Sequence, residues 1–458
     1  METTNGKENS AAGDSNRFGP VAVVYRPLAE LQLDPRNPRA HSPRQVRQIA
    51  RSIEAFGFNV PILIDAERKV IAGHGRVLAA RELKLLEVPT IRLEHLSTAQ
   101  AQAFMIADNR LTENSTWDDR LLAEQLQELA VLNLDFSLEL TGFEMGEIDL
   151  RIEGLSSPSA DQADPADAVP SAAGPPVTRS GDLWLLGRHR VYCGGALDES
   201  AYHTLLGDER AAMIFTDPPY NVPIAGNVSG LGAVRHREFV MASGELDAAQ
   251  FTAFLTRACE LLAAHSADGS LHYVCMDWRH MTELLAAGQA AYTELKHLCV
   301  WAKDNAGMGS LYRSQHELVF VFKHGRGAHR NNIQLGQYGR NRGNVWHYPG
   351  VISFGRRGEE GNLLALHPTV KPVALVADAI MDCTARGELV LDGFLGSGTT
   401  VIAAERVGRN CYGLELDPLY VDTIVRRWQA FTGDHARNAS SGELFAEREA
   451  VSEQCRVN

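Results

Sequence analysis

The stretch ELVLDGFLGSGTTVIAA, residues 388–404, decides the fold. An apolar strand that ends at Asp392 runs into a glycine-rich turn, and the turn runs into a helix. Glycines let the backbone of such a turn approach a ligand closely. Glu415 ends the next apolar strand, where an acid commonly accepts hydrogen bonds from ribose hydroxyls. The turn lacks the Gly-Lys-Ser/Thr ending of a triphosphate loop, and taken alone it is equally compatible with a turn that holds no ligand.

Apolar runs alternate with helical segments on both sides of this stretch. Such alternation predicts a parallel, doubly wound α/β sheet. Residues 181–193 have the pattern of a hairpin, which opens this domain. The expected strands of the sheet are residues 213–216, 271–276, 298–301, 318–322, 389–391 and 411–414.

The chain has 458 residues, which are too many for one ordinary core and predict two or three domains. Residues 151–180 are rich in Ser, Ala, Pro and Asp without periodicity, which predicts a linker. The second domain then covers residues 181–432, and a small α+β domain covers residues 21–150. Residues 1–20 are expected to be disordered, and the charged tail at 433–458 is expected to add little to the core.

The apolar and charged fractions are typical of soluble globular proteins. The net charge of -13 excludes a protein that coats nucleic acid over its whole surface, so any contact with phosphates has to be local. The 7 cysteines show no paired short spacing, which favours reduced structural cysteines and no metal site. No apolar stretch is long enough for a membrane span and the polar start has no signal core, so we expect a cytoplasmic protein without a membrane partner.

The segment TDPPYN, residues 216–221, places an acid just past the carboxyl end of an expected strand. The two prolines remove two amide donors, so the carbonyl of Pro218 can only accept hydrogen bonds. An exocyclic amine donates two hydrogens, which Asp217 and that carbonyl can accept, while Tyr220 offers an aromatic face for a base. The segment is therefore typical of a cradle for a planar ring that carries an amine, with a purely structural cis-proline turn as the alternative.

These segments resemble motifs of the amino-methylating DNA methyltransferases. Asp217-Pro218-Pro219-Tyr220 looks like their catalytic motif, residues 392–400 resemble their S-adenosyl-L-methionine loop, and HPTVKP at 367–372 matches the element that precedes this loop. The order of the three motifs is the permuted order of the β class, and the resemblance covers residues 181–432. Gly393 and Gly195 depart from the usual Pro and Asp of the family, and Asp198 is the candidate to replace the missing acid.

The resemblance implies a Rossmann-like methyltransferase domain that flips the target base out of the duplex. Asp217 and Pro218 would then accept from the target amine, with Pro219 fixing the turn and Tyr220 stacking on the base. Glu415 would hold the ribose of the cofactor, and His367 and Lys371 would lie at the other side of the cofactor. The residues expected around its methionine part are Asp392, Phe394, Gly396, Ser397, Gly398, Thr399 and Thr400.

A basic segment between the motifs is expected to hold DNA. It contains aromatic residues and no acid at 323–357, which favours contacts with phosphates and with a groove, and residues 323–360 resemble the target recognition region of the family. A solvated loop is the alternative. The glycine-containing segment 221–244 is expected to close over the flipped base. The candidate phosphate contacts are Arg326, Arg330, Arg340, Arg342, Arg356 and Arg357.

The first domain carries its own strand, glycine turn and helix at residues 70–80. Amides at the helix start together with Gly73, Gly75 and Arg76 suit an anion. About residues 21–129 resemble the ParB/sulfiredoxin-like domain, and sulfiredoxin chemistry is excluded because residues 1–150 contain no cysteine. The resemblance implies binding of a nucleotide or DNA, although His74 and Gly75 replace the usual Glu and Arg, and a purely structural domain is the alternative.

Together these features predict a DNA methyltransferase that acts on adenine-N6. An initial Asp in the catalytic motif favours adenine, because cytosine-N4 enzymes more often begin the motif with Ser. A cytosine-N4 enzyme is one alternative, and a ParB-like DNA-binding or nucleotide-binding protein with a degenerate methyltransferase half is another. The sequence leaves open RNA as a substrate, a homodimer, the recognition site and the presence of a cognate nuclease.

Overall fold

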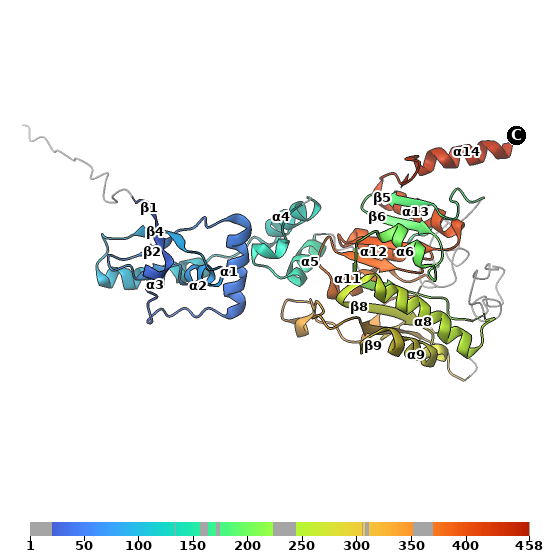
Figure 1. The fold of residues 1–458 in the computed structure, drawn as a ribbon, viewed down its shortest axis with the longest axis horizontal. Helices are drawn as coiled ribbons and strands as arrows, with labels where there is room; N and C mark the ends of the chain where they lie inside the picture. Colours follow the sequence, from blue (N-terminus) through green and yellow to red (C-terminus); the bar gives the residue numbers. More distant parts are fainter. Residues whose placement is uncertain are drawn as a thin grey trace, which may run out of the picture. The chain divides into compact units, whose positions relative to one another are not determined.

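The computed structural model describes residues 21–132, 134–155, 164–170, 175–222, 244–304, 306, 311–350 and 370–457 (Figure 1). The chain divides into two compact units. Unit 1 comprises Met1–Leu122 with Leu134–Phe143, and unit 2 comprises Ala123–Asn133 with Glu144–Asn458. None of the helices in these described ranges is long and apolar enough to cross a membrane.

Unit 1 contains a four-stranded sheet in the order β1-β4-β2-β3, as expected for a small α+β domain. Its core is formed by apolar residues of the strands and of α2, among them Ile62, Ile64 and Val77. The helix Pro43–Phe56 is capped at its start, where the Ser42 side chain accepts a hydrogen bond from the amide of Gln45. The elements are β1 Val23–Pro27, η1 Leu28–Glu30, α1 Pro43–Phe56, β2 Ile62–Ile64, β3 Val70–Ala72, α2 His74–Glu82, β4 Glu87–Arg92, α3 Thr98–Glu113 and η2 Leu138–Thr141, and α4 Asp119–Val131 spans the boundary between the units.

Unit 2 is built on a ten-stranded sheet in the order β11-β9-β10-β8-β7-β12-β13-β6-β5-β14. Every strand predicted for this domain is present. The strands are β5 Leu183–Leu186, β6 His189–Cys193, β7 Ala211–Thr216, β8 Ser266–Met276, β9 Glu294–Ala302, β10 His316–Lys323, β11 Val345–His347, β12 Leu389–Asp392, β13 Asn410–Glu415 and β14 Arg437–Asn438. The helical elements are α5 Met145–Gly154, η3 Pro165–Asp167, α6 Glu199–Leu206, α8 Ala248–Ala264, η4 Trp278–His280, α9 Met281–Ala291, η5 Gln334–Gly336, α11 Val373–Cys383, α12 Thr399–Arg406, α13 Pro418–Thr432 and α14 Phe445–Val457.

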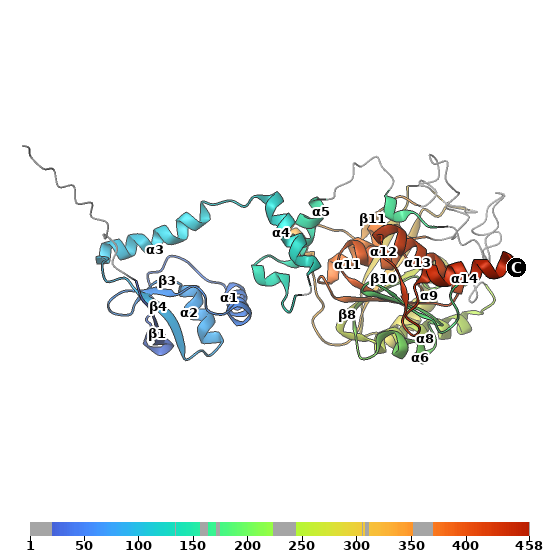
Figure 2. The same ribbon diagram turned by 90° about the horizontal axis from the view of Figure 1, so that it is seen from above.

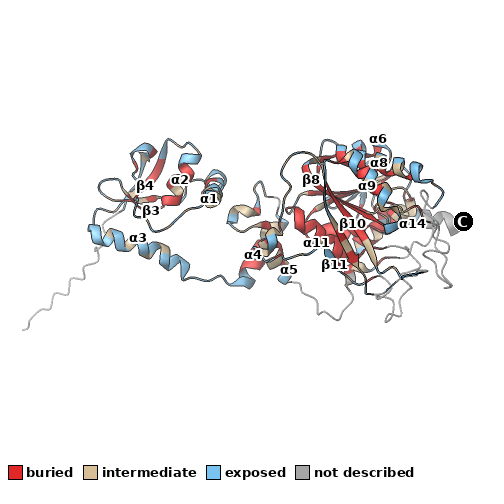
Figure 3. Cartoon of the chain, turned by 90° about the horizontal axis from the view of Figure 1, so that it is seen from below, coloured by how far each residue is buried: buried red, intermediate tan, exposed pale blue. Residues whose placement is uncertain are grey.

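The centre of this sheet is parallel, and antiparallel pairs occur towards both margins. Strands β8, β7, β12, β13 and β6 run in one direction, whereas β10 runs against both β8 and β9, and β5 forms a hairpin with β6. Helices α11, α12 and α13 cover one face and α6, α8 and α9 cover the other (Figure 2). Alternate residues of one strand serve the two faces, since Met213 packs in the first cluster and Ile214 in the second. The strands are buried between these helices (Figure 3), so the doubly wound fold is confirmed.

Two expectations about the ends of unit 2 need correction. The expected linker 151–180 belongs to unit 2, and some of its described residues bind the helices of that unit. The Asp167 carboxylate accepts from the amide of Val373 at 2.8 Å, and the carboxylate of Asp422 accepts from the amides of residues 177 and 178. The charged tail contributes to the core, because Phe445 is fully buried and its ring lies 5.2 Å from that of Trp184. One aromatic residue in a polar tail is enough to anchor it, and composition alone does not reveal this.

A buried ion pair fixes α5 within unit 2. Asp149 lies on α5, and its two carboxylate oxygens accept hydrogen bonds from Arg409 Nη1 at 2.8 Å and Nη2 at 2.7 Å. Both side chains have 0% exposure. Arg386 donates to the same carboxylate at 3.0 Å. Two arginines and one acid therefore share a dry site in which each charge needs the others.

We expect Asp149→Ala to lower the free energy of unfolding of unit 2 by about 3–5 kcal/mol, because it leaves the Arg409 guanidinium buried without its counterion. Denaturant unfolding of the full chain measures this loss. Glu260→Gln is the matched control, since Glu260 is an exposed acid on α8. Equal midpoints for the two variants would show that α5 is not needed for the stability of unit 2.

Candidate functional site

The predicted catalytic and cofactor residues meet at one edge of the sheet in unit 2. β7, β12 and β13 are parallel neighbours, so their carboxyl ends lie side by side. Asp217 follows the last residue of β7, Asp392 ends β12 and Glu415 ends β13. In open α/β sheets, ligands bind outside the carboxyl ends of the strands, so the topology places three acids where a ligand is expected.

Asp392 ties together the segments around this edge. One carboxylate oxygen accepts from the Thr216 hydroxyl at 2.8 Å and from the Phe394 amide at 2.9 Å, and the other accepts from the Thr400 hydroxyl at 2.6 Å. Burial raises the pKa of Asp392 to about 6, against the opposing effect of these hydrogen bonds. The side chain thus joins the end of β7, the glycine turn and the start of α12.

The glycine turn packs closely against its surroundings. Gly398 has φ 83 and precedes α12, and a Cβ at this position would lie 2.9 Å from the side chain of Ile424. The amide of Gly396 donates to one carboxylate oxygen of Glu415 at 2.8 Å, and the amide of Asp417 donates to the other at 2.9 Å. Burial raises the pKa of Glu415 to about 7. Each oxygen of Glu415 keeps a lone pair, so this carboxylate can still accept from a ligand.

Asp217 lies in a cluster of charged side chains from four segments. Its carboxylate accepts from the Tyr220 hydroxyl at 2.5 Å and from Lys371 Nζ at 2.5 Å. Lys371 Nζ also lies 3.0 Å from Glu317 on β10, and the other oxygen of Glu317 accepts from Lys303 at 2.5 Å. Lys371 connects this cluster to the glycine turn, because its carbonyl accepts from the Thr399 hydroxyl at 3.4 Å.

The protonation states in this cluster follow from its charges. Burial opposes the charge of Lys371, but Asp217 and Glu317 outweigh it and raise the pKa of the ammonium. Burial also opposes the charge of Glu317, yet Lys371 and Lys303 bring its pKa down to about 2. Burial raises the pKa of Asp217, and Lys371 opposes this rise. Lys371 is therefore a buried cation shared by two acids.

Comparisons with known proteins agree with this geometry. Residues 211–426 match the N6/N4 DNA methylase family, and residues 120–180 match the ParB-methyltransferase HTH domain. Unit 2 contains an N6/N4 DNA methylase domain. The ParB-like nuclease domain-containing protein YnaK of Escherichia coli (strain K12) is 50% identical over 82 residues, which are 18% of this chain and 94% of that protein. The chain therefore also belongs to the ParB-like family.

A further relative is the type II methyltransferase M2.MboI of Moraxella bovis, which is 25% identical over 259 residues, 53% of this chain and 88% of that protein. The solved PvuII DNA methyltransferase, which is cytosine-N4-specific, has 15% identity and a TM-score of 0.41 over 58% of this chain and 92% of that chain. The ParB of Caulobacter crescentus in complex with CTP-gamma-S has 21% identity and a TM-score of 0.27 over 30% of this chain and 81% of that chain. TM-scores this low add nothing to the functional argument.

The methyltransferase unit brings together most of the site residues predicted from sequence. Asp217, Tyr220 and Lys371 are in contact, although Lys371 was expected beside the cofactor. Pro218 is buried and Pro219 is partly buried, and no peptide bond between described residues is cis. Asp198 caps α6 by accepting from the amide of Ser200 at 2.9 Å, so the acid expected to replace Gly195 already has a structural role. His367, Arg356 and Arg357 lie outside the described residues, as does most of segment 221–244.

Sequence reasoning missed Glu317 and Lys303 as site residues. Glu317 is the second residue of β10, whose remaining residues up to Phe322 are apolar. An acid at the start of a buried strand is a usable signal for a partnered charge. Its partners lie on other segments, however, and their identity depends on the antiparallel pairing of β10 with β9.

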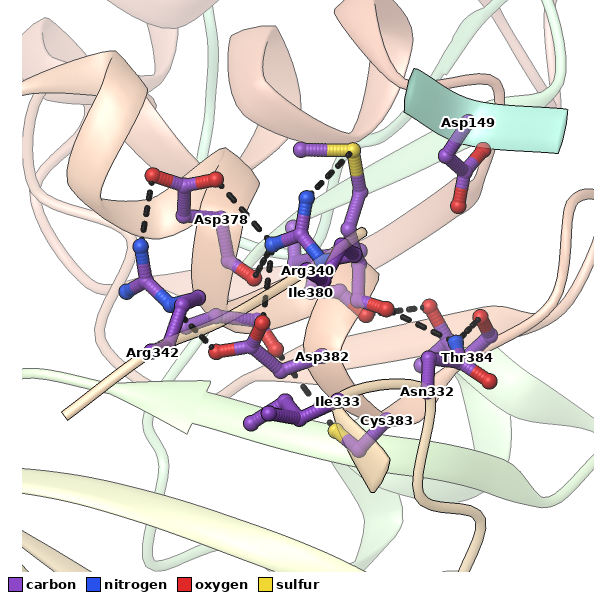
Figure 4. Close-up of polar contacts among 12 residues, drawn as sticks. Asp149, Asn332, Ile333, Arg340, Arg342, Asp378, Ile380, Asp382, Cys383 and Thr384 are labelled. Carbon is purple, nitrogen blue, oxygen red and sulfur yellow. Dashed lines mark hydrogen bonds and ion pairs between the residues drawn. The ribbon is translucent and has the colours of Figure 1, made fainter. Parts of the chain in front are cut away.

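The expected phosphate contacts of Arg340 and Arg342 need correction (Figure 4). Arg340 is 3% exposed and pairs with Asp382 at 2.8 Å and Asp378 at 3.1 Å. Arg342 pairs with the same two acids at 2.9 Å and 2.8 Å. The two acids lie one turn apart on α11, so together they hold both guanidinium groups. A buried Arg340 that two acids hold cannot contact a phosphate, and the two ion-paired arginines fasten their loop to α11 instead.

The remaining basic candidates follow the carboxyl end of β10, which lies at the sheet edge opposite to Asp217, because β10 runs against β8 and β8 runs with β7. Arg326 is exposed, and Arg330 lies 3.8 Å from Glu388. Asn332 then fixes the loop by donating to the carbonyls of Met381 and Thr384 at 2.7 and 2.8 Å. Contacts of Arg326 and Arg330 with DNA stay a prediction.

In unit 1 the structure places Gly73, Gly75 and Arg76 together. Gly73 has φ 99 at the start of α2, and its missing Cβ would lie 3.1 Å from the guanidinium of Arg76. Close packing against α1 explains the glycine at position 75, since a Cβ there would lie 2.9 Å from Ile49. Arg76 thus covers the turn at which an anion was predicted.

We expect Gly398→Ala to destabilise the methyltransferase unit more than Gly387→Ala by about 1–3 kcal/mol. Both glycines have a similar positive φ, 83 and 80, so the substitution places an alanine in the left-handed region at both positions. Only at Gly398 would the new methyl group meet Ile424, whereas nothing lies within 4 Å of the Cβ position of Gly387. Denaturant unfolding of the two variants measures the difference, and equal stabilities would contradict close packing of the cofactor turn.

Proposed function

We propose that the protein transfers a methyl group from S-adenosyl-L-methionine to the N6 amine of an adenine that is flipped out of DNA. The observation that carries this proposal is the direct link between the two halves of the site. Asp217 contacts Lys371 through its carboxylate, and the Lys371 carbonyl contacts Thr399 at the end of the glycine turn. An amine held at Asp217 therefore lies next to a group bound at the turn.

The residues at the turn fit this cofactor. Its ribose hydroxyls need an acceptor, which Glu415 offers with one free lone pair on each oxygen. Its methionine part needs a close approach of the backbone, which Gly396 and Gly398 allow. When bound, the cofactor supplies a sulfonium methyl group that is already electrophilic.

The chain's own part in the reaction is to hold and orient the amine. Asp217 and the carbonyl of Pro218 accept its two hydrogens, which withdraws its lone pair from the ring and points it at the methyl carbon. With the cofactor bound, the nitrogen–carbon bond would form as the carbon–sulfur bond breaks with its electron pair on sulfur, and the Asp217 carboxylate would accept the proton that the amine then releases. Tyr220 holds the base by stacking. No nucleophile from the protein is required.

Adenine is preferred because the motif begins with Asp217. Cytosine-N4 methylation is the alternative, since the same geometry serves both amines. DNA phosphates are proposed partners of Arg326 and Arg330. For unit 1 we propose an anionic ligand such as a nucleotide phosphate at the turn covered by Arg76, by likeness to ParB-like relatives.

The wild-type protein is expected to form N6-methyladenine in unmodified, amplified genomic DNA, and Asp217→Ala is expected to lower the rate by at least about 100-fold because the amine loses its charged acceptor. Labelled S-adenosyl-L-methionine, followed by digestion to nucleosides, identifies the product. Glu260→Gln is the control for the substitution. Labelled methylcytosine without methyladenine would overturn the choice of adenine, and full activity of Asp217→Ala would overturn the proposed site.

Binding of S-adenosyl-L-methionine is expected to weaken about tenfold from about pH 8 to about pH 6. The raised pKa of Glu415, about 7, means that its carboxylate becomes protonated within this window and loses acceptor capacity as the pH falls. Calorimetric titration at several pH values measures the slope. In Glu415→Gln the affinity should be low and independent of pH, and a variant that keeps the wild-type slope would show that another group titrates.

A further inference from the structure

We propose that Glu317 is a positioning residue of the amine pocket, which takes over the Lys371 ammonium so that Asp217 is free to accept the target amine. This inference rests on the proposed function. Neither the catalytic motif nor the cofactor loop includes Glu317, and it reaches the pocket from β10, a strand at the antiparallel margin of the sheet.

Both oxygens of Asp217 have strong donors within the protein. Lys371 Nζ donates to one oxygen and the Tyr220 hydroxyl donates to the other, each at 2.5 Å. Asp217 is 20% exposed and Lys371 is 5% exposed, so little water competes for these contacts. An arriving amine has to share or replace the donors of this carboxylate.

The ammonium of Lys371 also opposes the chemistry electrostatically. As the nitrogen–carbon bond forms, the amine nitrogen gains positive charge, which the negative charge of Asp217 stabilises. A lysine cation 2.5 Å from the same carboxylate neutralises part of that charge and repels the new cation. The reaction therefore favours an arrangement in which Lys371 has moved its charge to another acid.

Glu317 is positioned to pair with the Lys371 ammonium when it leaves Asp217. Its Oε2 already lies 3.0 Å from Lys371 Nζ, so the ammonium can leave Asp217 without becoming unpaired. Lys303 donates to the other oxygen at 2.5 Å and lies 4.6 Å from the centre of the Trp301 ring, which fixes the orientation of the Glu317 carboxylate. Glu317 is 12% exposed, so its pairing with Lys371 is only weakly screened by water.

The charges in this cluster balance, so single and double charge-removing variants have different expected effects. Two carboxylates, Asp217 and Glu317, face two ammonium groups, Lys371 and Lys303. Removing only the charge of Glu317 leaves Lys371 with Asp217 as its one acidic partner in the cluster. Removing the charges of Glu317 and Lys371 together frees Asp217 again. A role limited to packing would make the double variant worse than either single variant.

Methyl transfer to unmodified, amplified genomic DNA is the assay, with calorimetric binding of S-adenosyl-L-methionine as a second readout. Glu317→Gln is expected to lower kcat at least about tenfold with unchanged cofactor affinity, because Lys371 stays on Asp217. Lys371→Met is expected to shift the acid limb of the pH–rate profile to higher pH, because Asp217 and Glu317 lose their shared cation. Glu317→Gln combined with Lys371→Met is expected to be faster than Glu317→Gln alone.

Glu294→Gln, a half-exposed acid paired with Lys296 on β9, is the control and should match the wild type. If Glu317→Gln does not fold, Glu317→Asp is used instead in the single and the double variant. The shorter side chain of Asp draws the carboxylate away from Lys371. Unchanged kcat in the Glu317 variant, or a double variant whose losses simply multiply, would overturn the inference. A wild-type protein that methylates no DNA would instead overturn the proposed function.

Discussion

The buried carboxylate of Asp392 is the contact on which the site depends. It ends β12 and binds hydroxyls from two other segments, Thr216 at the end of β7 and Thr400 in the first turn of α12. Asp217 follows Thr216 directly, so its position is set by the same hydrogen bond. The glycine turn lies between Asp392 and Thr400, so its shape is set as well. One buried acid therefore fixes both the acceptor of the amine and the turn proposed for the cofactor.

The features that depend on residues close together in the sequence could be predicted from local sequence patterns. The parallel strands follow from apolar runs of fitting length, and the alignment of their carboxyl ends follows from topology, so Asp217, Asp392 and Glu415 could be assigned to one edge. Contacts between distant segments were not predictable in the same way. The family resemblance implied that Lys371 lies beside the cofactor, whereas the contact of its ammonium with Asp217 was not predicted. Glu317 depends on the pairing of an antiparallel strand, which no periodicity reveals.

The arginines of the basic segment show why charge alone predicts function poorly. A count of arginines without acids between residues 323 and 357 suggested a phosphate-binding surface, but Asp378 and Asp382 of α11 supply the missing acids from a later part of the chain. Asp149 on α5 and Arg409 are likewise far apart in the sequence and form a buried ion pair. The stretch that matches the ParB-methyltransferase HTH domain includes α5, and the buried ion pair of Asp149 makes this helix part of the methyltransferase unit. A boundary drawn at residue 181 would cut through this contact.

The amine pocket combines two demands that conflict unless charge can move within it. An acid must stay ionised at a largely buried position, which requires a nearby cation, and the same acid must stabilise a cation that forms during the reaction. Lys371 meets the first demand and opposes the second. A second acid within reach of the ammonium removes the conflict, because the cation can remain paired while Asp217 changes partners. Glu317 lies on β10, outside the catalytic and cofactor motifs. In a protein with the same Asp-Pro-Pro-Tyr sequence but no acid at this place on β10, the lysine would stay on the motif's aspartate, and that carboxylate would accept the target amine less readily.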